Sequence, residues 1–195
     1  VNRMLCSEAM IDAQKLRTGE LEENDWAELI NAMGPLSEAP IYIDDTPGVT
    51  PMEVRSKCRR LKVEKGLGLI VIDYLQLIKA GRKFSNRASE VGDISKAIKS
   101  LAMELHVTII LLSQLNRLSE QKETKEPTMA ELRESGDIEQ DASNIILIWN
   151  LDEDGQYKGW KVEKQRQGTH LKEVLQFDGD HMKFIERTET IEQIK

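Results

Sequence analysis

The sequence is poor in cysteine, proline and glycine: its 195 residues include two Cys, five Pro and 12 Gly. Cys6 and Cys58 have no metal-ligand spacing around them, so we expect buried free thiols in a reducing cytoplasm. Proline and glycine are too few for a low-complexity chain. No stretch approaches the roughly 18 apolar residues of a membrane span, and the N-terminus lacks a signal-peptide pattern. These shortages exclude disulfide-stabilised, low-complexity and membrane-spanning chains.

Positive charge is also in short supply. The net charge is −7 and the pI is ≈ 5.2, whereas broad, nonspecific wrapping of nucleic acid requires a basic surface. A few phosphate contacts from one loop remain compatible with this balance, especially where several subunits contribute. Hydrophobic residues make up 39% and charged residues 31%, which is typical of ordinary soluble proteins. The length fits one α/β domain over residues 1–195 with a single core.

Helix signals dominate the first third of the chain. Residues 1–15 have a helical pattern without a capping residue, which indicates a chain that begins inside a helix. Asp25-Trp26-Ala27-Glu28 has the form of a capping box and predicts a short amphipathic helix that Gly34-Pro35 ends. A short strand is expected over 41–43. Thr50-Pro51-Met52-Glu53 is a second capping box with proline at the first helical position.

Buried strands and a long helix are expected in the rest of the chain. Uninterrupted apolar runs predict strands covered on both faces, and apolar residues at a 3.6-residue period predict a helix between the first two. The strands are 69–72, 107–112 and 145–149, and the helix runs from Val91 to Leu105. Turns then separate three antiparallel strands, at 157–165, 173–177 and 181–185. The sequence therefore predicts a mainly parallel α/β sheet flanked by helices, with an antiparallel C-terminal extension.

Two of the predicted strands end in polar residues. Asp73 follows the first apolar run and has the form of a Walker B acid, which holds Mg²⁺ through water beside bound phosphates. Ser113-Gln114 ends the second run, where a neutral amide can hydrogen-bond a terminal phosphate. Each signal alone has a plain alternative: Asp73 would cap a turn after a buried strand, and Gln114 would lie in a solvated turn. Together, at one sheet edge, they favour a nucleotide site.

Two further segments carry residue types that suit phosphate. Lys164 and Arg166 stand two apart and project from one face if the strand reaches that far; a solvent-facing strand of alternating charge is the alternative. Arg133-Glu134-Ser135-Gly136-Asp137 precedes a short helix, where Gly136 allows close backbone approach and N–H groups can bind phosphate. Plain helix capping by Ser135 or Asp137 is the alternative there.

Four segments together resemble the motifs of the DnaB-type replicative helicases, in both order and rough spacing. They are Leu-Ile-Val-Ile-Asp-Tyr-Leu-Gln-Leu-Ile (69–78), Leu-Leu-Ser-Gln-Leu-Asn-Arg (111–117), Leu-Arg-Glu-Ser-Gly-Asp-Ile-Glu-Gln-Asp-Ala (132–142) and Lys-Gln-Arg-Gln-Gly (164–168). The upstream Arg-Thr-Gly-Glu-Leu (17–21) is similar as well. The resemblance covers nearly the whole chain.

The resemblance implies a RecA-like ATPase core that works as a ring, commonly hexameric, around single-stranded DNA. Its cofactors would be ATP and Mg²⁺, and its partners a primase and a helicase loader, in the cytoplasm of a bacterium or encoded by a phage. Asp73 would be the magnesium-associated acid, and Gln114 would couple the nucleotide to the DNA loop. The DNA-binding residues would be Arg133, Glu134 and Gly136. Lys164 and Arg166 would reach into a neighbour's ATP site.

Two elements of this family are absent from the sequence. No glycine is followed by lysine, so the phosphate-binding loop G-x-x-x-x-G-K-[ST] does not occur, and the family's catalytic glutamate is expected upstream of Val1. We therefore expect a helicase core cut just downstream of its phosphate-binding loop, which hydrolyses ATP poorly on its own. Two alternatives remain open: a recombinase-like ATPase, and a non-hydrolysing DNA- or partner-binding RecA-like module.

Overall fold

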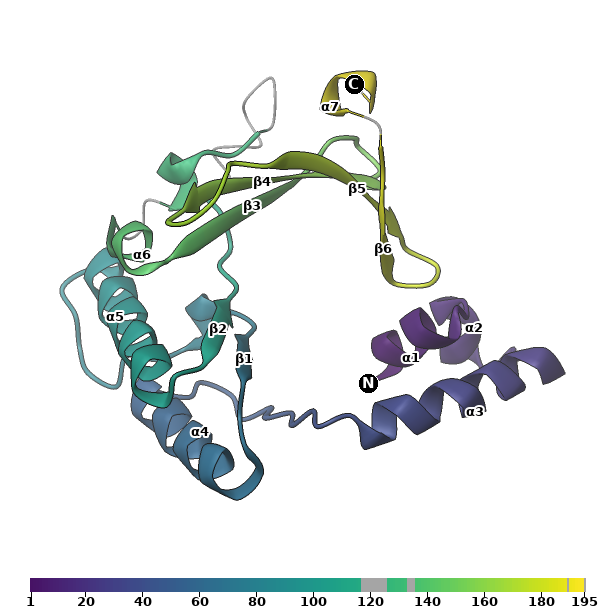
Figure 1. Ribbon diagram of the computed structural model, residues 1–195, viewed down its shortest axis with the longest axis horizontal. Helices are drawn as coiled ribbons and strands as arrows, with labels where there is room; N and C mark the ends of the chain where they lie inside the picture. Colours follow the sequence, from purple (N-terminus) through teal and green to yellow (C-terminus); the bar gives the residue numbers. More distant parts are fainter. Residues whose placement is uncertain (117–125, 133–135, 189, 195) are drawn as a thin grey trace. The chain divides into compact units, whose positions relative to one another are not determined.

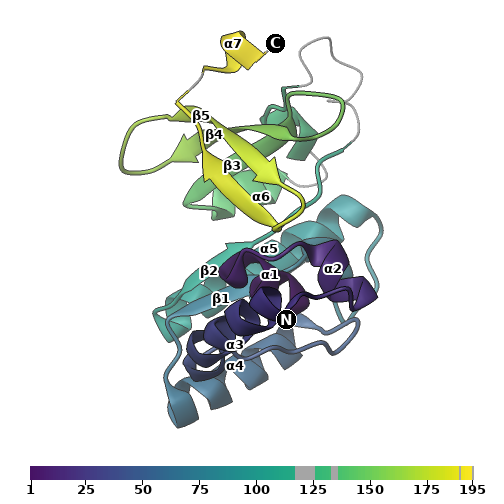
Figure 2. The ribbon, with the colours of Figure 1, turned by 90° about the vertical axis from the view of Figure 1, so that its right-hand side faces the viewer.

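The computed structural model describes residues 1–116, 126–132, 136–188 and 190–194, and the chain divides into two compact units (Figures 1 and 2). The first unit consists of Val1–Asp44, Ile148–Lys161 and Leu171–Lys195, and the second of Asp45–Leu147 and Val162–His170. Strands β3 and β4 contribute residues to both units. No described helix is long and apolar enough to cross a membrane.

A two-stranded parallel sheet is the centre of the second unit. β1 (Leu69–Ile72) pairs with β2 (Thr108–Leu111), in a register that sets Ile72 opposite Leu111. The two strands are joined through α5 (Arg87–Leu105), and α4 (Pro51–Lys65) precedes β1. This strand–helix–strand order confirms the parallel α/β arrangement predicted from the sequence.

Both helices of this unit begin at the caps that their sequences encode. Thr50 and Glu53 form the predicted capping box: the Thr50 N–H donates to the Glu53 carboxylate at 2.7 Å, and the Glu53 N–H donates to Thr50 Oγ1 at 3.3 Å. At α5, the Asn86 side chain accepts from the Ser89 N–H at 2.8 Å. The helix ends at His106, which takes a left-handed conformation with φ 49°.

The core of the second unit lies between α5 and one face of the β1–β2 sheet. Its buried members are Leu75, Ile78, Val91, Ile94 and Ile98, and Ile72, Ile109 and Leu111 pack against them. The alternate strand residues point the other way, and Leu69 and Val71 are 51% and 57% exposed. The prediction that both faces of these strands are covered is therefore wrong for this chain, because the apolar contacts of the unit gather on one face only.

The predicted antiparallel extension is confirmed as a four-stranded sheet of order β3-β4-β5-β6. Its strands are β3 (Asn144–Asn150), β4 (Tyr157–Gln165), β5 (Lys172–Asp178) and β6 (Lys183–Glu186). Pairs such as Gly159–Val174 and Phe177–Phe184 fix its register. The expected third buried strand is β3, but it belongs to this sheet and only every second residue, from Ile145 to Trp149, is buried.

The N-terminal helices of the first unit differ from the sequence prediction. The single helix expected over 1–15 is two helices, α1 (Asn2–Ala9) and α2 (Ala13–Thr18). Met10 ends α1 in a left-handed conformation with φ 53°, and the Asp12 side chain caps α2 by accepting from the Gln14 N–H. The left-handed backbone at Met10 and the Asp12 cap together explain the break between the two helices.

The third helix, α3 (Glu23–Glu38), is longer at both ends than predicted. Its capping box is formed by Glu22 and Asp25, three residues earlier than expected, with the Glu22 N–H donating to Asp25 at 3.0 Å. Pro35 lies inside the helix and does not end it. Leu29 and Ala32 of α3 share a buried core with Ala9 and Ile11 at the end of α1. This packing keeps the chain helical beyond Pro35, which has no N–H to donate.

Short elements complete the fold. They are the 3₁₀ turns η1 (Leu75–Leu77) and η3 (Met129–Leu132), and the helices α6 (Gly136–Asp141) and α7 (Ile191–Ile194). The strand expected over 41–43 is not formed: the Ile41 N–H bonds the Ala39 carbonyl at 2.7 Å instead of a neighbouring strand. The last strand begins at Lys183, because 181–182 form a turn in which Met182 has φ 55°.

Candidate functional site

The ends of β1 and β2 bring two predicted site residues to one edge of the parallel sheet. Asp73 comes directly after Ile72, and the Leu112 N–H donates to the Ile72 carbonyl at 3.0 Å. The ladder continues with the Leu75 N–H donating to the Leu112 carbonyl at 2.9 Å. Gln114 follows two residues later, and both predicted side chains are exposed. The expectation that Asp73 and Gln114 share one sheet edge is confirmed.

A hollow of about 330 Å³ opens at this edge, and its lining includes Gln114. Gln76, Ser113 and Asn116 contribute polar groups, while Val91, Leu132 and Ile138 contribute apolar surface. Concave sites that combine an apolar wall with a few converging polar groups are typical of ligand binding. Gln76 was not singled out by the sequence, because only its side-chain hydrogen bonds to the end of β2 distinguish it from a surface glutamine.

Glu131 is a second residue of this hollow that sequence reasoning assigned no role. Its side chain is buried, with 4% exposure, and its carboxylate accepts from the Thr128 N–H at 2.7 Å and from Thr128 Oγ1 at 2.6 Å. The Asn116 N–H donates to the Glu131 carbonyl at 3.2 Å. Glu131 therefore holds η3 together and ties it to the segment after Gln114. The spacing Thr128-x-x-Glu131 is the signal that could have found it.

Lys164 and Arg166 lie where β4 ends. Lys164 is half-buried within the strand, and its Nζ donates to the Glu139 carbonyl of α6. β4 ends at Gln165, as predicted, so exposed Arg166 lies one residue beyond the strand, and the condition under which both cations project from one face of it is not met. Among the described residues, Lys164 hydrogen-bonds α6 and neither Asp73 nor Gln114. The hairpin loop is tied back by His170 Nδ1, 2.8 Å from the Val162 carbonyl.

Helix α6 starts at Gly136, the one predicted DNA-binding residue that the structure describes; Arg133 and Glu134 lie outside the described residues. Polar contacts fix α6 on α5. Buried Ser95 donates from its hydroxyl to the Asp141 carboxylate at 2.8 Å, and the Lys96 ammonium lies 3.0 Å from Asp137. The hydrogen bond to Asp137 raises the pKa of Lys96.

Helix α6 approaches α5 at a glycine. A β-carbon at Gly92 would collide with Asp137 Oδ2, so any larger residue there would force the Asp137 carboxylate to move. Lys99 adds a further link by donating to Ser143 Oγ at 3.0 Å, just after α6. Helix α6 is thus held by α5 through Asp137 and Asp141, and by Lys164 of β4 through the Glu139 carbonyl.

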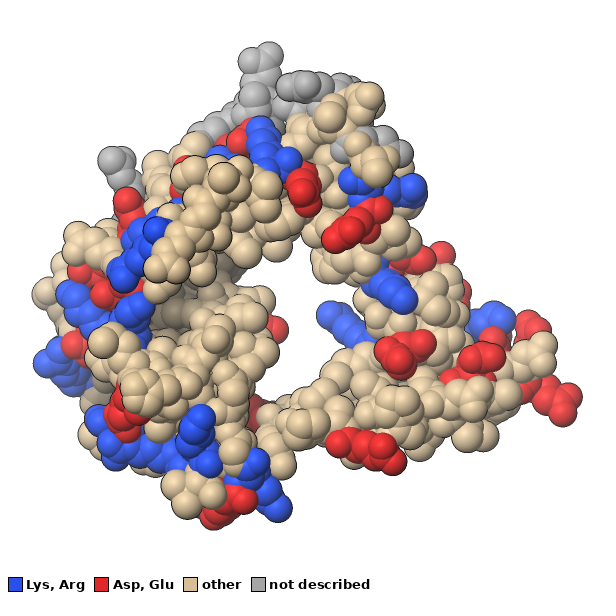
Figure 3. Space-filling model, in the orientation of Figure 1, with Lys and Arg blue, Asp and Glu red and all other residues tan. Residues whose placement is uncertain are grey.

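The charges of the protein are unevenly distributed (Figure 3). Helix α4 is rich in cations, namely Arg55, Lys57, Arg59, Arg60, Lys62 and Lys65, whereas the first turn of α3 carries Glu23 and Asp25. Arg55 lies 2.5 Å from the Glu104 carboxylate of α5, which also pairs with Arg59. Hydrogen bonds from Arg59 and Arg55 lower the pKa of Glu104. The net negative charge therefore coexists with a basic helix in the second unit.

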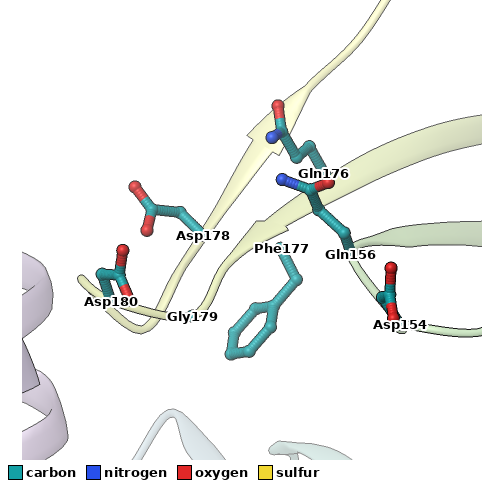
Figure 4. A pocket seen from close by; sticks show the side chains of 8 residues that line it. Asp154, Gln156, Gln176, Phe177, Asp178, Gly179 and Asp180 are labelled. Atoms are coloured by element: carbon teal, nitrogen blue, oxygen red, sulfur yellow. The ribbon is translucent and has the colours of Figure 1, made fainter.

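A larger hollow of about 570 Å³ lies at the turns of the antiparallel sheet (Figure 4). Asp154, Asp178 and Asp180 are among its lining residues. Asp178 Oδ2 is 2.8 Å from His181 Nδ1, and this hydrogen bond lowers the pKa of Asp178. Three carboxylates repel phosphate, so this hollow is poorly suited to an anionic ligand. No group of three potential metal ligands of the His, Cys, Asp and Glu types occurs among the described residues.

Comparison with known proteins adds an independent line of evidence. Residues 1–186 match the family described as DnaB-like helicase C terminal domain. The chain is 50% identical over 192 residues to the replicative DNA helicase DnaC of Bacillus subtilis (strain 168), an alignment that covers 95% of the chain and 42% of that protein. The chain thus spans less than half the length of this curated relative.

Two solved structures are similar in fold as well as in sequence. One is described as a DnaB-like replicative helicase and its interactions with primase; it has a TM-score of 0.88 at 31% identity, over 94% of this chain and 46% of that one. The other is described as an ATPase domain, with a TM-score of 0.88 at 31% identity, over 95% of this chain and 69% of that one. The similarity confirms the RecA-like fold class predicted from the sequence.

Proposed function

The chain belongs to the family of DnaB-like helicase C-terminal domains, and from this premise we propose that it is the motor domain of an ATP-dependent replicative DNA helicase. In this proposal residues 1–195 act as one RecA-like domain that moves along single-stranded DNA and unwinds the duplex at the replication fork. The protein works in the cytoplasm of a bacterium, or is encoded by a phage.

The observation that carries this proposal is the common edge of Asp73 and Gln114. In open parallel sheets, ligands bind beyond the carboxyl ends of the strands, and the pairing of Ile72 with Leu111 sets both residues at such an end. An acid and a neutral amide at one sheet edge suit a Mg²⁺–nucleotide complex, since the acid can hold the cation and the amide can bond an anionic phosphate. The amide can bond the terminal phosphate without adding charge.

The residues at this edge fit Mg²⁺ and ATP. Mg²⁺ keeps several waters and is held by one or two carboxylates together with substrate phosphates, so the single exposed carboxylate of Asp73 is a sufficient protein ligand. When bound, the metal ion neutralises charge on the phosphates. Asp73 would orient the metal's water shell. Gln114 would hydrogen-bond the terminal phosphate and couple the nucleotide state to the DNA-binding segment.

We place Lys164 and Arg166 in the nucleotide site of a neighbouring copy in a ring, which we propose to be a hexamer. Arg166 is exposed beyond the end of β4, where it is free to cross a subunit boundary. A guanidinium with its fork of N–H donors is suited to the charge that develops on a transferring phosphoryl group. Lys164 contacts α6 in the same subunit, and so connects this hairpin to the DNA-binding segment.

DNA binding is assigned to Arg133, Glu134 and Gly136, which face the central channel of the ring in this proposal. Support comes from the polar contacts that hold α6, which begins at Gly136, against α5. A few phosphate contacts from each of several subunits reconcile single-stranded DNA binding with the net charge of −7. A primase and a helicase loader are the protein partners.

A phosphate-binding loop is required for hydrolysis, and these 195 residues do not contain one. We therefore propose that the residues 1–195 alone hydrolyse ATP poorly. The same observation favours a second candidate function, a non-hydrolysing DNA- or partner-binding module of RecA-like fold. A recombinase-like ATPase is the remaining alternative, which filament assembly and strand exchange in place of unwinding would reveal.

The deciding experiment is an ATPase assay on the full-length protein, with and without single-stranded DNA. We expect DNA-stimulated hydrolysis that Asp73→Ala lowers by at least about a hundredfold. Asp154→Ala, which removes an exposed carboxylate at a turn of the other unit, serves as the matched control and should leave the rate unchanged. Binding of DNA without hydrolysis would favour the non-hydrolysing module, and binding of neither ATP nor single strands would refute the motor proposal.

A further inference from the structure

Gln76 extends from the turn η1, which begins two residues after Asp73. It occupies the middle of η1, and the residues that anchor this turn, Leu75 and Ile78, are 0% and 3% exposed. Both belong to the apolar core beneath α5. The backbone that carries Gln76 is therefore fixed with respect to Asp73 by buried contacts, and the side chain reaches outward to the end of β2.

The amide of Gln76 meets both main-chain polar groups of Gln114. Its Nε2 donates to the Gln114 carbonyl at 3.3 Å and to Ser113 Oγ at 3.2 Å. Its Oε1 accepts from the Gln114 N–H at 3.4 Å. β2 ends at Leu111, so Gln114 lies beyond the ladder of the sheet. The Gln76 side chain takes the place of a neighbouring strand and supplies protein partners for this exposed backbone, which would otherwise bond water.

We propose that Gln76 is a positioning residue that fixes the position of the Gln114 main chain relative to η1, the turn that begins two residues after Asp73. The inference rests on the proposed function, in which Gln114 bonds the terminal phosphate of ATP. A side chain that senses a phosphate must be held within a few tenths of an ångström of its working place. Two opposed hydrogen bonds from one amide fix both the position and the rotation of the Gln114 peptide.

The same contacts connect Gln114 to other residues around the hollow. Gln76 and Ser113 line the hollow at the sheet edge together with Gln114 and Asn116, and Asn116 is tied to η3 by its N–H bond to Glu131. A shift of Gln114 on loss of the phosphate would therefore change the bonds of Gln76 first. Removing the amide should uncouple nucleotide hydrolysis from DNA while leaving nucleotide binding in place.

The test combines a structural and a kinetic measurement on the full-length protein. Gln76→Leu removes all three hydrogen bonds at similar side-chain size, and Gln76→Glu keeps the acceptor for the Gln114 N–H but loses the donor. Gln156→Leu, the same chemical change at an exposed turn of the other unit, is the control. Amide hydrogen exchange is followed at Gln114 and, as an internal reference, at Leu112, whose N–H bonds the Ile72 carbonyl.

In Gln76→Leu we expect exchange at Gln114 to accelerate about tenfold, with Leu112 unchanged, because only the former loses its acceptor. DNA-stimulated kcat should fall about tenfold with little change in KM for ATP, and Gln76→Glu should lie between this variant and the wild type. Combining Gln76→Leu with Gln114→Ala should slow turnover no further than Gln114→Ala alone, since the two residues act as one unit.

Unchanged exchange at Gln114, or effects of the two substitutions that multiply, would overturn the assignment. If Gln76→Leu unfolds at a much lower temperature than the wild type, Gln76→Glu is used in its place, and it is compared with Gln114→Ala in the same way. Should the wild type show no DNA-stimulated hydrolysis, the proposed function fails, and exchange at Gln114 still decides whether Gln76 holds it.

Discussion

Ser95 and Asp141 join α5 to α6 through a hydrogen bond of 2.8 Å that is largely shielded from solvent, since the serine is 5% exposed. Replacing Ser95 with alanine leaves a carboxylate oxygen in a protected place without its donor. We expect Ser95→Ala to lower the free energy of unfolding by about 1–3 kcal/mol, measured by urea denaturation.

Ser100→Ala is the control for this substitution, because Ser100 lies on the exposed side of the same helix and its hydroxyl donates to the Lys96 carbonyl of its own helix. Its effect should stay within about 0.5 kcal/mol. Equal losses for the two variants would mean that the contact between α5 and α6 contributes nothing to stability.

The Glu104 carboxylate holds α4 to α5 through Arg55 and Arg59, and its lowered pKa makes that link dependent on pH. A carboxyl whose pKa is lower in the folded protein contributes stability above its unfolded pKa, and this contribution is lost as the pH falls through the folded value. We expect Glu104→Gln to lower the Tm by about 2 °C at pH 7. The difference should vanish in acid, below the lowered pKa.

Glu64→Gln on α4 provides the comparison, since it removes an exposed carboxylate of the same charge. Its Tm should match that of the wild type at both pH values. A difference between Glu104→Gln and the wild type that persists unchanged in acid would contradict the charge-based explanation.

Subunit mixing tests the proposal that Arg166 acts on a neighbour's nucleotide. Asp73→Ala and Arg166→Ala subunits should each be nearly inactive alone. In a random 1:1 mixture, about a quarter of the interfaces pair an intact Asp73 with an intact Arg166, so about a quarter of the wild-type ATPase rate should return.

Mixing Asp73→Ala with Gln114→Ala is the matched control. Both residues lie at the same edge of one subunit's sheet, so no mixed interface regains a complete site. No recovery with Arg166→Ala would place Arg166 in its own subunit's chemistry. Recovery in the control would instead mean that Asp73 and Gln114 do not serve the same site.

A tight contact between Gly159 and Trp149 gives a prediction for the antiparallel sheet. A β-carbon at Gly159 would lie 2.5 Å from Trp149 Cε2, and the indole is 8% exposed, with little space to move. We expect Gly159→Ala to lower the free energy of unfolding by about 1–3 kcal/mol through overpacking, as measured in urea. At Gly68 a β-carbon meets no atom within 4 Å, so Gly68→Ala should have an effect near zero.

The elements predicted best from the sequence are those whose signals are local. The Thr50 and Glu53 cap, the apolar run before Asp73 and the spacing of Val91, Ile94 and Ile98 depend on residues within a few positions, and the structure confirms all three. The break at Met10 was missed because no glycine or asparagine marks the left-handed residue.

Long-range pairing was less predictable. The run from Ile145 to Trp149 is as apolar as a central parallel strand, yet it belongs to the antiparallel sheet, because hydrophobicity alone does not select a neighbouring strand. Gln76 was overlooked for a related reason: nothing near it in sequence shows that its amide meets Gln114, which is 38 residues away. The edge shared by Asp73 and Gln114 was predictable, since parallel strands end on the same side.

The pairing of Leu69–Ile72 with Thr108–Leu111 makes these two segments intolerant of any change in length. One inserted residue in either strand would advance its end by about 3.3 Å and turn the following side chains to the opposite face. Asp73 or Gln114 would then lie on the other face of the sheet, although every residue type remained in place. The connection between η1 and α5 carries no such restriction, and insertions there should leave the geometry of the site intact.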